Sequence, residues 1–126
     1  MNIIYVGGAY SGNTEANVQL ILEYLQHLWD NGEVGFSPVE AFHRPSMHAP
    51  TKDAKFWMQL CNKFLSVCTE VHLVIGEEGM HNNMSDRILN SVGSMAELGY
   101  ANIYKMPVVY VVKRKDGSFG RVPELV

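Results

Sequence analysis

Residues 2–14 read NIIYVGGAYSGNT, an apolar run that leads into a turn rich in glycine. The run Asn2–Val6 predicts a short buried strand, and the two glycines after it predict a tight loop. Asn13 or Thr14 can cap a helix, along which apolar residues recur at helical spacing. That apolar face comprises Val18, Ile21, Leu22, Leu25, Leu28 and Trp29. Gly32 predicts the end of the helix, so the chain opens with a strand, a loop and a helix.

The alternation of strands and helices continues along the chain. Further strands are predicted at Val34–Phe36, Val71–Ile75 and Val108–Val112. A second helix is predicted after Thr51, with an apolar face made of Phe56, Trp57, Leu60, Phe64 and Leu65. A third is predicted from about Ser91 to Tyr104, and residues 113–126 are interpreted as a turn and an extended tail.

This order of elements predicts the fold class. Strands that alternate with helices favour a parallel sheet with right-handed crossovers. At 126 residues the chain has room for one domain. We therefore expect a single α/β domain over residues 1–126, with a flavodoxin- or Rossmann-like three-layer fold and a mainly parallel sheet of four to five strands.

Composition excludes several classes of function. Apolar residues make up 47% of the chain and charged residues 18%, as expected for a packed core. The net charge of −3 and the lack of a basic stripe argue against binding a nucleic-acid polymer. No apolar stretch approaches the length needed to span a membrane, and no signal peptide is evident. Cys61 and Cys68 are interpreted as reduced core residues, which predicts a cytoplasmic protein.

Two loops at the expected ligand-binding edge carry polar residues. In open parallel sheets, ligands bind outside the carboxyl ends of the strands. The loop Gly7–Asn17 offers glycines, hydroxyl groups and a helix N-terminus, which suit an anion, although a plain tight turn is the alternative. The loop Gly76–Glu97 places Ser91 at a predicted helix start and Glu97 among apolar neighbours. Here the alternatives are an N-cap serine and a solvated carboxylate.

Both loops support a resemblance to a known family. The opening Ile3-Ile4-Tyr5-Val6-Gly7-Gly8-Ala9-Tyr10-Ser11-Gly12 resembles the first strand and loop of the nucleoside 2-deoxyribosyltransferase and nucleotide N-glycosidase superfamily. The run Ser91-x-Gly93-x-x-x-Glu97-Leu98-Gly99-Tyr100-Ala101 resembles its Ser/Asp-x-Gly-x-x-x-Glu signature, which is the more specific of the two. The likeness covers roughly residues 3–112.

The resemblance implies a set of site residues. It assigns Glu97 to the anomeric carbon of the sugar, where N-glycosidic cleavage develops oxocarbenium character, and Tyr10 to orienting Glu97 or the sugar. Serine at position 91 is typical of members that contact a 5′-phosphate, whereas members acting on free nucleosides tend to carry aspartate there. The implied substrate- and phosphate-binding residues are Gly8, Ser11, Asn17, Ser91, Gly93 and Ser94. Asn17 can equally be a solvated helix residue.

The sequence also departs from the family pattern. Members usually carry an acid that protonates the leaving base, but the corresponding position here is Cys61 or Asn62, and Thr69 stands where aspartate is common. Serine at position 91 nevertheless favours a nucleoside 5′-monophosphate N-glycosidase as the function. The alternatives are a nucleotide-binding protein without turnover and, third, a nucleoside 2-deoxyribosyltransferase.

The implied partners are a small nucleotide or nucleoside and other copies of the same chain. The resemblance implies a homo-oligomer, and neither a membrane nor a nucleic acid is an expected partner. No cofactor or metal is expected, because the histidines lack metal-ligand spacing. Four of the histidines are interpreted as surface or loop residues: His43, His48, His72 and His81.

Overall fold

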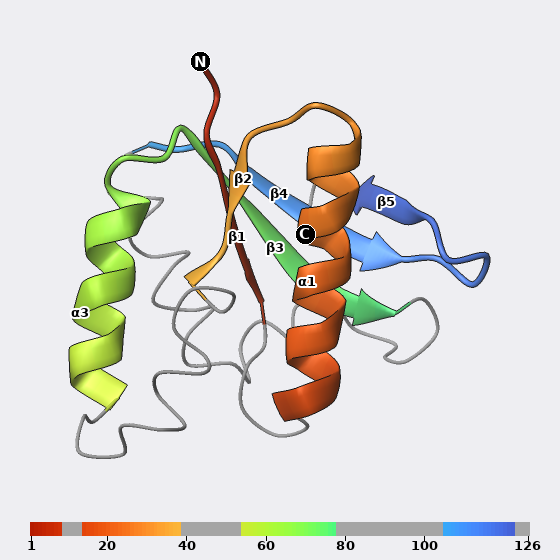
Figure 1. The fold of residues 1–126 in the computed structure, drawn as a ribbon, viewed down its shortest axis with the longest axis horizontal. Helices are drawn as coiled ribbons and strands as arrows, with labels where there is room; N and C mark the ends of the chain where they lie inside the picture. Colours follow the sequence, from red (N-terminus) through yellow and green to blue (C-terminus); the bar gives the residue numbers. More distant parts are fainter. Residues whose placement is uncertain (9–13, 39–53, 78–104, 123–126) are drawn as a thin grey trace.

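The structure is a computed structural model that describes residues 1–8, 14–38, 54–77 and 105–122. Its elements are ordered along the chain as follows (Figure 1): β1 (Ile4–Gly8), α1 (Thr14–Asp30), β2 (Gly35–Phe36), α3 (Ala54–Leu65), β3 (Glu70–Glu77), β4 (Val108–Lys113) and β5 (Phe119–Val122). The helix predicted at 91–104 and the predicted cap residues Asn13 and Thr51 lie outside the described residues.

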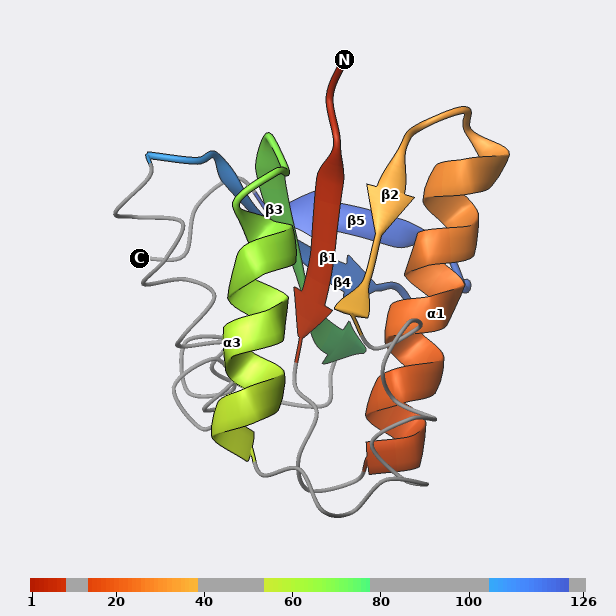
Figure 2. The ribbon, with the colours of Figure 1, turned by 60° about the vertical axis from the view of Figure 1, so that its left-hand side comes forward.

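The five strands form one sheet in the order β2-β1-β3-β4-β5. The first four strands are parallel, and β5 runs antiparallel to β4. This is the strand order of flavodoxin-like folds, so the predicted α/β class with a mainly parallel sheet is confirmed. Figure 2 shows the sheet between α1 and α3, which gives the three layers.

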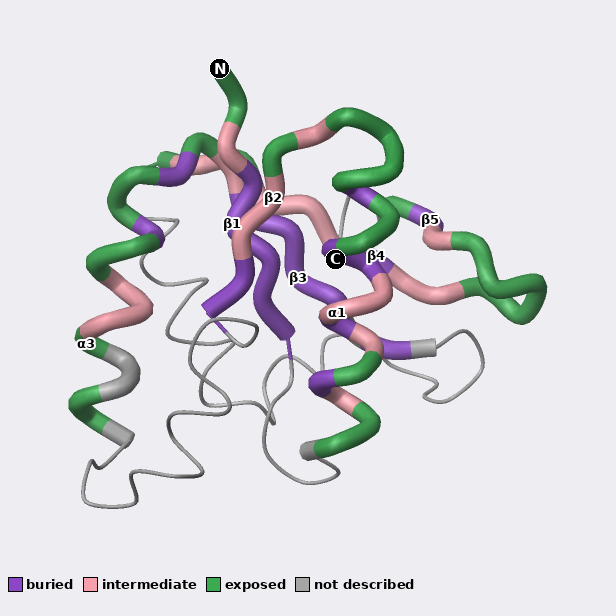
Figure 3. The backbone as a smooth tube through the Cα atoms, viewed as in Figure 1, coloured by how far each residue is buried: buried purple, intermediate pink, exposed green. Residues whose placement is uncertain are grey.

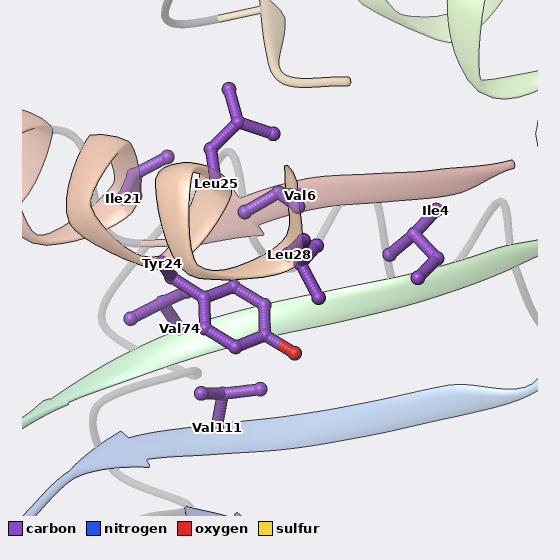
Figure 4. Close-up of a cluster of buried hydrophobic side chains, with 8 residues drawn as sticks. All are labelled: Ile4, Val6, Ile21, Tyr24, Leu25, Leu28, Val74 and Val111. Atoms are coloured by element: carbon purple, nitrogen blue, oxygen red, sulfur yellow. The ribbon is translucent and has the colours of Figure 1, made fainter. Parts of the chain in front are cut away.

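The main core lies between α1 and the sheet. Alternate residues of a strand point to opposite faces, so Ile4 and Val6 of β1 face α1 while Tyr5 faces the other way. Figure 4 shows how these side chains interlock; the cluster comprises Ile4, Val6, Ile21, Tyr24, Leu25, Leu28, Val74 and Val111. Burial of about eight such side chains removes the apolar face of α1 from water, which stabilises the helix on the sheet.

A second, smaller core lies on the opposite face of the sheet. It comprises Tyr5, Leu65, Cys68, Val71 and Leu73. Phe56, Leu60 and Phe64 of α3 are less buried than the sequence pattern predicted, and Figure 3 shows exposed turns along this helix. Phe56 is 38% exposed and Phe64 is 37% exposed, and the Phe64 ring stacks on Phe36 with centroids 4.9 Å apart.

The apolar face of α1 also differs from the prediction at two positions. Tyr24, which the prediction omitted, is 1% exposed, whereas Trp29 is 46% exposed. Leu28 occupies the inward position, and the next residue of a helix points about 100° away from it. The Trp29 indole N–H therefore lies at the surface, where it donates to the carbonyl of Gly35 at 3.0 Å. Gly32 ends the helix as predicted, with φ of 74°.

Two strands extend beyond their predicted ends. β1 continues through Gly7 and Gly8, which pair with Leu73 and Val74 instead of forming the loop. β3 continues past Ile75 by means of a bulge, and Gly76 follows the bulge with φ of 126°, a conformation that favours glycine. Glycines can continue a strand when a neighbouring strand offers backbone hydrogen-bond partners. The prediction of loops from these glycines therefore ended both strands too early.

The predicted extended tail contains a fifth strand. β5 forms a hairpin with β4 through a turn closed by the Arg114 N–H, which donates to the Ser118 carbonyl at 2.7 Å. Gly117 in this turn has φ of 89°. Only Val111 of the six residues of β4 is buried, since this strand lies next to the edge of the sheet.

Cys61 and Cys68 form no disulfide with each other, as predicted, but only Cys68 lies in the core, since Cys61 is half-buried. Cys68 is buried and donates to the Phe64 carbonyl at 3.4 Å, and burial raises its pKa to about 11. A thiol held in this way is neutral at physiological pH and acts as a small apolar residue. Within the described ranges, neither helix has the length and apolarity that crossing a membrane requires.

Candidate functional site

The candidate site lies where β1 and β3 end side by side. β1 pairs with β2 on one side and with β3 on the other, so the strand order reverses between β1 and β3. Crevices for ligands in open α/β sheets form at this reversal, outside the carboxyl ends of the strands. The N-termini of α1 and α3 lie at the same end of the molecule (Figures 1 and 2). Helix N-termini carry partial positive charge, so this end favours anionic groups.

Gly8, the last residue of β1, is buried and packs tightly against β3. A Cβ atom at this position would lie 2.5 Å from the backbone carbonyl oxygen of Val74 and 3.4 Å from Ile21 of α1. The backbone oxygen cannot move away without distorting β3. A side chain at position 8 would therefore separate the two strands that form the floor of the candidate site.

We expect Gly8→Ala to lower the free energy of unfolding by about 1–3 kcal/mol, the usual cost of overpacking. Gly35→Ala is the matched control, because its Cβ would meet the flexible ends of Leu25 and Leu28 at 3.0 Å and no backbone atom among its three nearest contacts. Urea denaturation of both variants measures the difference. Equal midpoints for the two variants would show that the β1–β3 contact at Gly8 does not require glycine.

Asn17 is the other predicted site residue that the structure describes. It lies in the first turns of α1, three residues after Thr14, and is half-buried. Glu15 precedes it in the first turn and is exposed. The remaining predicted site residues lie outside the described residues: Tyr10, Ser11, Ser91, Gly93, Ser94 and Glu97. The structure thus brings together Gly8 and the helix that carries Asn17.

His72 was interpreted from the sequence as a surface or loop residue, and this interpretation was wrong. It lies in the middle of β3 and is 0% exposed. Its Nδ1 is 2.6 Å from the hydroxyl of Tyr24, so the pair joins the sheet to α1. Burial lowers the pKa of His72 to about 4, and the positive charge of Arg121 acts in the same direction. Strand alternation alone could have placed His72 on the same face as Val74.

Basic residues near the end of the chain have acidic partners. Arg121 is 3.3 Å from Glu33, and Lys113 is 2.7 Å from Glu23. The Lys113 hydrogen bond lowers the pKa of Glu23, whose partial exposure makes this a modest surface interaction. In the described part of the chain, no group of three or more histidine, cysteine or acidic residues could hold a metal ion.

Comparison with known proteins supports the fold but provides no sequence relative. No protein-family model matches the chain, and no curated protein matches it. A solved 2-deoxyribosyltransferase from the psychrotolerant bacterium Bacillus psychrosaccharolyticus superposes with a TM-score of 0.59 at 19% identity. The match covers 90% of this chain and 74% of that one.

A second solved structure, a 2-desoxiribosyltransferase from Leishmania mexicana, superposes with a TM-score of 0.57 at 12% identity. The chain has the fold of the 2-deoxyribosyltransferases. The second match covers 90% of this chain and 65% of that one, so the chain is shorter than both. At these identities the likeness establishes the fold, and the resemblance to the superfamily noted in the sequence is confirmed at that level.

Positions where the sequence departs from the superfamily pattern have ordinary structural roles here. Thr69 joins the start of β3 to β1, since its Oγ1 accepts from the Ile3 N–H at 2.8 Å and donates to the Ile3 carbonyl at 3.2 Å. Cys61 and Asn62 are half-buried in the second half of α3. Neither side chain is a carboxylic acid, so the described part of α3 offers no strong general acid at that position.

Proposed function

We propose that the protein is a nucleoside 5′-monophosphate N-glycosidase in which Glu97 acts at the anomeric carbon of the sugar. The observation that carries this proposal is the run Ser91-x-Gly93-x-x-x-Glu97, which follows β3 in a chain with the 2-deoxyribosyltransferase fold. The strand-order reversal between β1 and β3 supports it, because this is where such folds bind ligands.

The chemistry assigned to Glu97 follows from the bond that breaks. When the C1′–N bond is cleaved, the base leaves with the bonding electron pair and takes a proton, and C1′ gains positive charge. A carboxylate stabilises this charge or attacks C1′ to form a covalent intermediate. Water then adds at C1′, which breaks the bond to Glu97 where one has formed, and loses a proton that balances the one taken by the base. The products are the free base and the sugar 5-phosphate. Tyr10 is proposed to orient Glu97 or the sugar.

The phosphate of the substrate is assigned to the N-terminus of α1 and to serine side chains. Ser11 and the amides that follow Gly8 come immediately before α1, and a helix N-terminus favours anions. Ser91, with Gly93 and Ser94, is proposed to complete the phosphate site. A neutral hydroxyl at position 91 does not repel a phosphate, whereas a carboxylate there would repel it. Asn17, on the same helix, is proposed to contact the sugar or phosphate.

A second candidate function is nucleotide binding without turnover. Cys61 and Asn62 favour it, because neither can donate a proton to the leaving base as a carboxylic acid would. Base transfer between nucleosides is a third candidate, since both solved neighbours are 2-deoxyribosyltransferases. Serine at position 91 argues against free nucleosides. We further propose a cytoplasmic homo-oligomer whose partner is this small molecule and not a nucleic acid.

One assay separates these functions. The purified protein is incubated with ribo- and deoxyribonucleoside monophosphates and with the free nucleosides, each with and without an added acceptor base, and chromatography measures free and exchanged bases. We expect base release from at least one monophosphate without an acceptor. Exchange seen only with nucleosides and an acceptor would establish a transferase instead.

The same protein samples also test the binding function by thermal unfolding. A nucleotide that binds without reacting raises the free energy of unfolding by about 2.7 kcal/mol at one hundred times its Kd. Stabilisation by a monophosphate with no product after hours would establish a binding protein. No stabilisation and no product from any compound in the panel would overturn both proposals.

A further inference from the structure

Among the described residues, the buried side chains between α1 and the sheet are apolar except for the pair Tyr24 and His72. Tyr24, which belongs to the core cluster of α1, is 1% exposed and His72 is 0% exposed, and their ring centroids lie 5.8 Å apart. The hydrogen bond between the Tyr24 hydroxyl and Nδ1 of His72 measures 2.6 Å. This bond connects the middle of α1 to the middle of β3.

The second ring nitrogen of His72, Nε2, lacks a hydrogen bond of this kind. Nε2 is buried and has no hydrogen-bond partner among the residues that the structure describes. Oε1 of Glu70 is 3.3 Å away, within ion-pair distance, but makes no hydrogen bond with Nε2. The site therefore favours a neutral imidazole, because burial penalises the charged form and Nε2 has no hydrogen bond to offset that cost.

Charged and titratable groups from each surrounding element face this pair. Glu33 and Glu70 favour a positive charge on His72, and Arg121 opposes it. The Arg121 guanidinium is itself paired with Glu33 at 3.3 Å, which weakens the stabilisation that Glu33 gives to a positive charge on His72. His27 lies further out, 5.9 Å from the Tyr24 ring. The groups are Tyr24 and His27 of α1, Glu33 before β2, Glu70 of β3 and Arg121 of β5.

We propose that His72 makes the docking of α1 on the sheet sensitive to acid, so that uptake of a proton by its imidazole releases α1 before the opposite layer opens. The core on the other face consists of Tyr5, Leu65, Cys68, Val71 and Leu73, none of which gains charge in acid. Among the residues that the structure describes, His72 in the α1 layer is the fully buried group that a proton would charge, and its acidic neighbour Glu70 forms no hydrogen bond with it.

The direction of the effect follows from the two states of His72. Burial lowers the pKa of His72 to about 4 in the folded protein, below its ordinary value of 6.5. A released α1 exposes the imidazole, which then binds a proton more readily than the docked state does. Acid therefore favours release, with the effect beginning as the pH falls below 6.5 and levelling off near pH 4.

Hydrogen exchange of backbone amides tests this proposal on the intact protein. Protection of α1 (residues 14–30) and α3 (residues 54–65) is measured from pH 7 to pH 4 and corrected for intrinsic exchange rates. We expect protection of α1 to fall by up to about tenfold per pH unit, about 100-fold between pH 7 and pH 4. Protection of α3 is expected to change much less over the same range.

Two variants assign the effect to His72. His72→Gln keeps a hydrogen-bonding side chain that does not titrate, and Tyr24→Phe with His72→Phe replaces both partners by apolar groups, which can be nearly neutral for stability. In either variant, protection of α1 is expected to be nearly independent of pH. An unchanged pH dependence, or equal loss of protection in α1 and α3 of the original protein, would overturn the proposal.

A measurement on the unmodified protein covers the case in which both variants fail to fold. Nuclear magnetic resonance of the His72 ring reports its protonation directly. We expect the docked form to keep a neutral ring down to about pH 4. A ring that becomes protonated near pH 6.5 while α1 stays protected would also overturn the proposal.

Discussion

Changing Glu97 to glutamine is expected to lower base release from a nucleoside 5′-monophosphate by at least about a thousandfold. Glutamine has nearly the same size and shape but lacks the negative charge that stabilises or attacks C1′. Substrate binding should change little, because the proposed phosphate contacts do not involve this residue. Single-turnover release of base, together with nucleotide binding measured by calorimetry, separates the chemical step from binding.

Asp30→Asn is the control for this experiment, because Asp30 is an exposed acidic residue at the far end of α1. The same change of acid to amide there should leave base release unaltered. If Glu97→Gln retains the activity of the original protein, Glu97 is not the catalytic carboxylate. If the variant loses binding as well as turnover, Glu97 belongs to the binding site instead.

Changing Ser91 to aspartate is expected to lower the preference for nucleotides over free nucleosides by at least about a hundredfold. Two unit charges 4 Å apart repel by about 4 kcal/mol at an effective dielectric constant of 20, and the phosphate carries the charge that aspartate would face. Activity toward nucleosides should persist, since they lack the phosphate. The ratio of kcat/KM for a monophosphate to that for its nucleoside measures the effect.

Ser91→Asn is the matched control, because asparagine has the size of aspartate without its charge. We expect this variant to lose far less of the preference for nucleotides. Equal losses in the two variants would attribute the effect to side-chain size. An unchanged preference in Ser91→Asp would remove position 91 from the phosphate site while leaving the assignment of Glu97 intact.

The sequence predicted the described helices and most strands because their signals are local. The apolar spacing of residues 18–28 follows one face of α1, and the short apolar runs near residues 4, 71 and 108 lie in β1, β3 and β4. The errors occur where the structure of a segment depends on a residue that is distant in the sequence. Gly7 and Gly8 remain in a strand because they pair with residues of β3. The strand β5 forms because it pairs with the edge of β4.

The candidate site was predictable in its location more than in its detail. Loops after β1 and β3 were expected at the ligand-binding edge, and the strand-order reversal lies between these two strands. The need for glycine at position 8 was expected from a ligand contact, but the structure relates it to the carbonyl of Val74. Close approach of two backbones depends on sheet register, which composition and periodicity do not specify.

By itself, the sequence determined the class of the fold and the type of most elements. The spacing of apolar residues that distinguishes strands from helices is visible within a few consecutive residues. Tertiary structure alone decided the strand order, the inward position of Tyr24 and the burial of His72. These features depend on which surfaces meet. Histidine at position 72 is polar in any sequence profile, and only the helix packed over β3 makes it a buried partner of Tyr24.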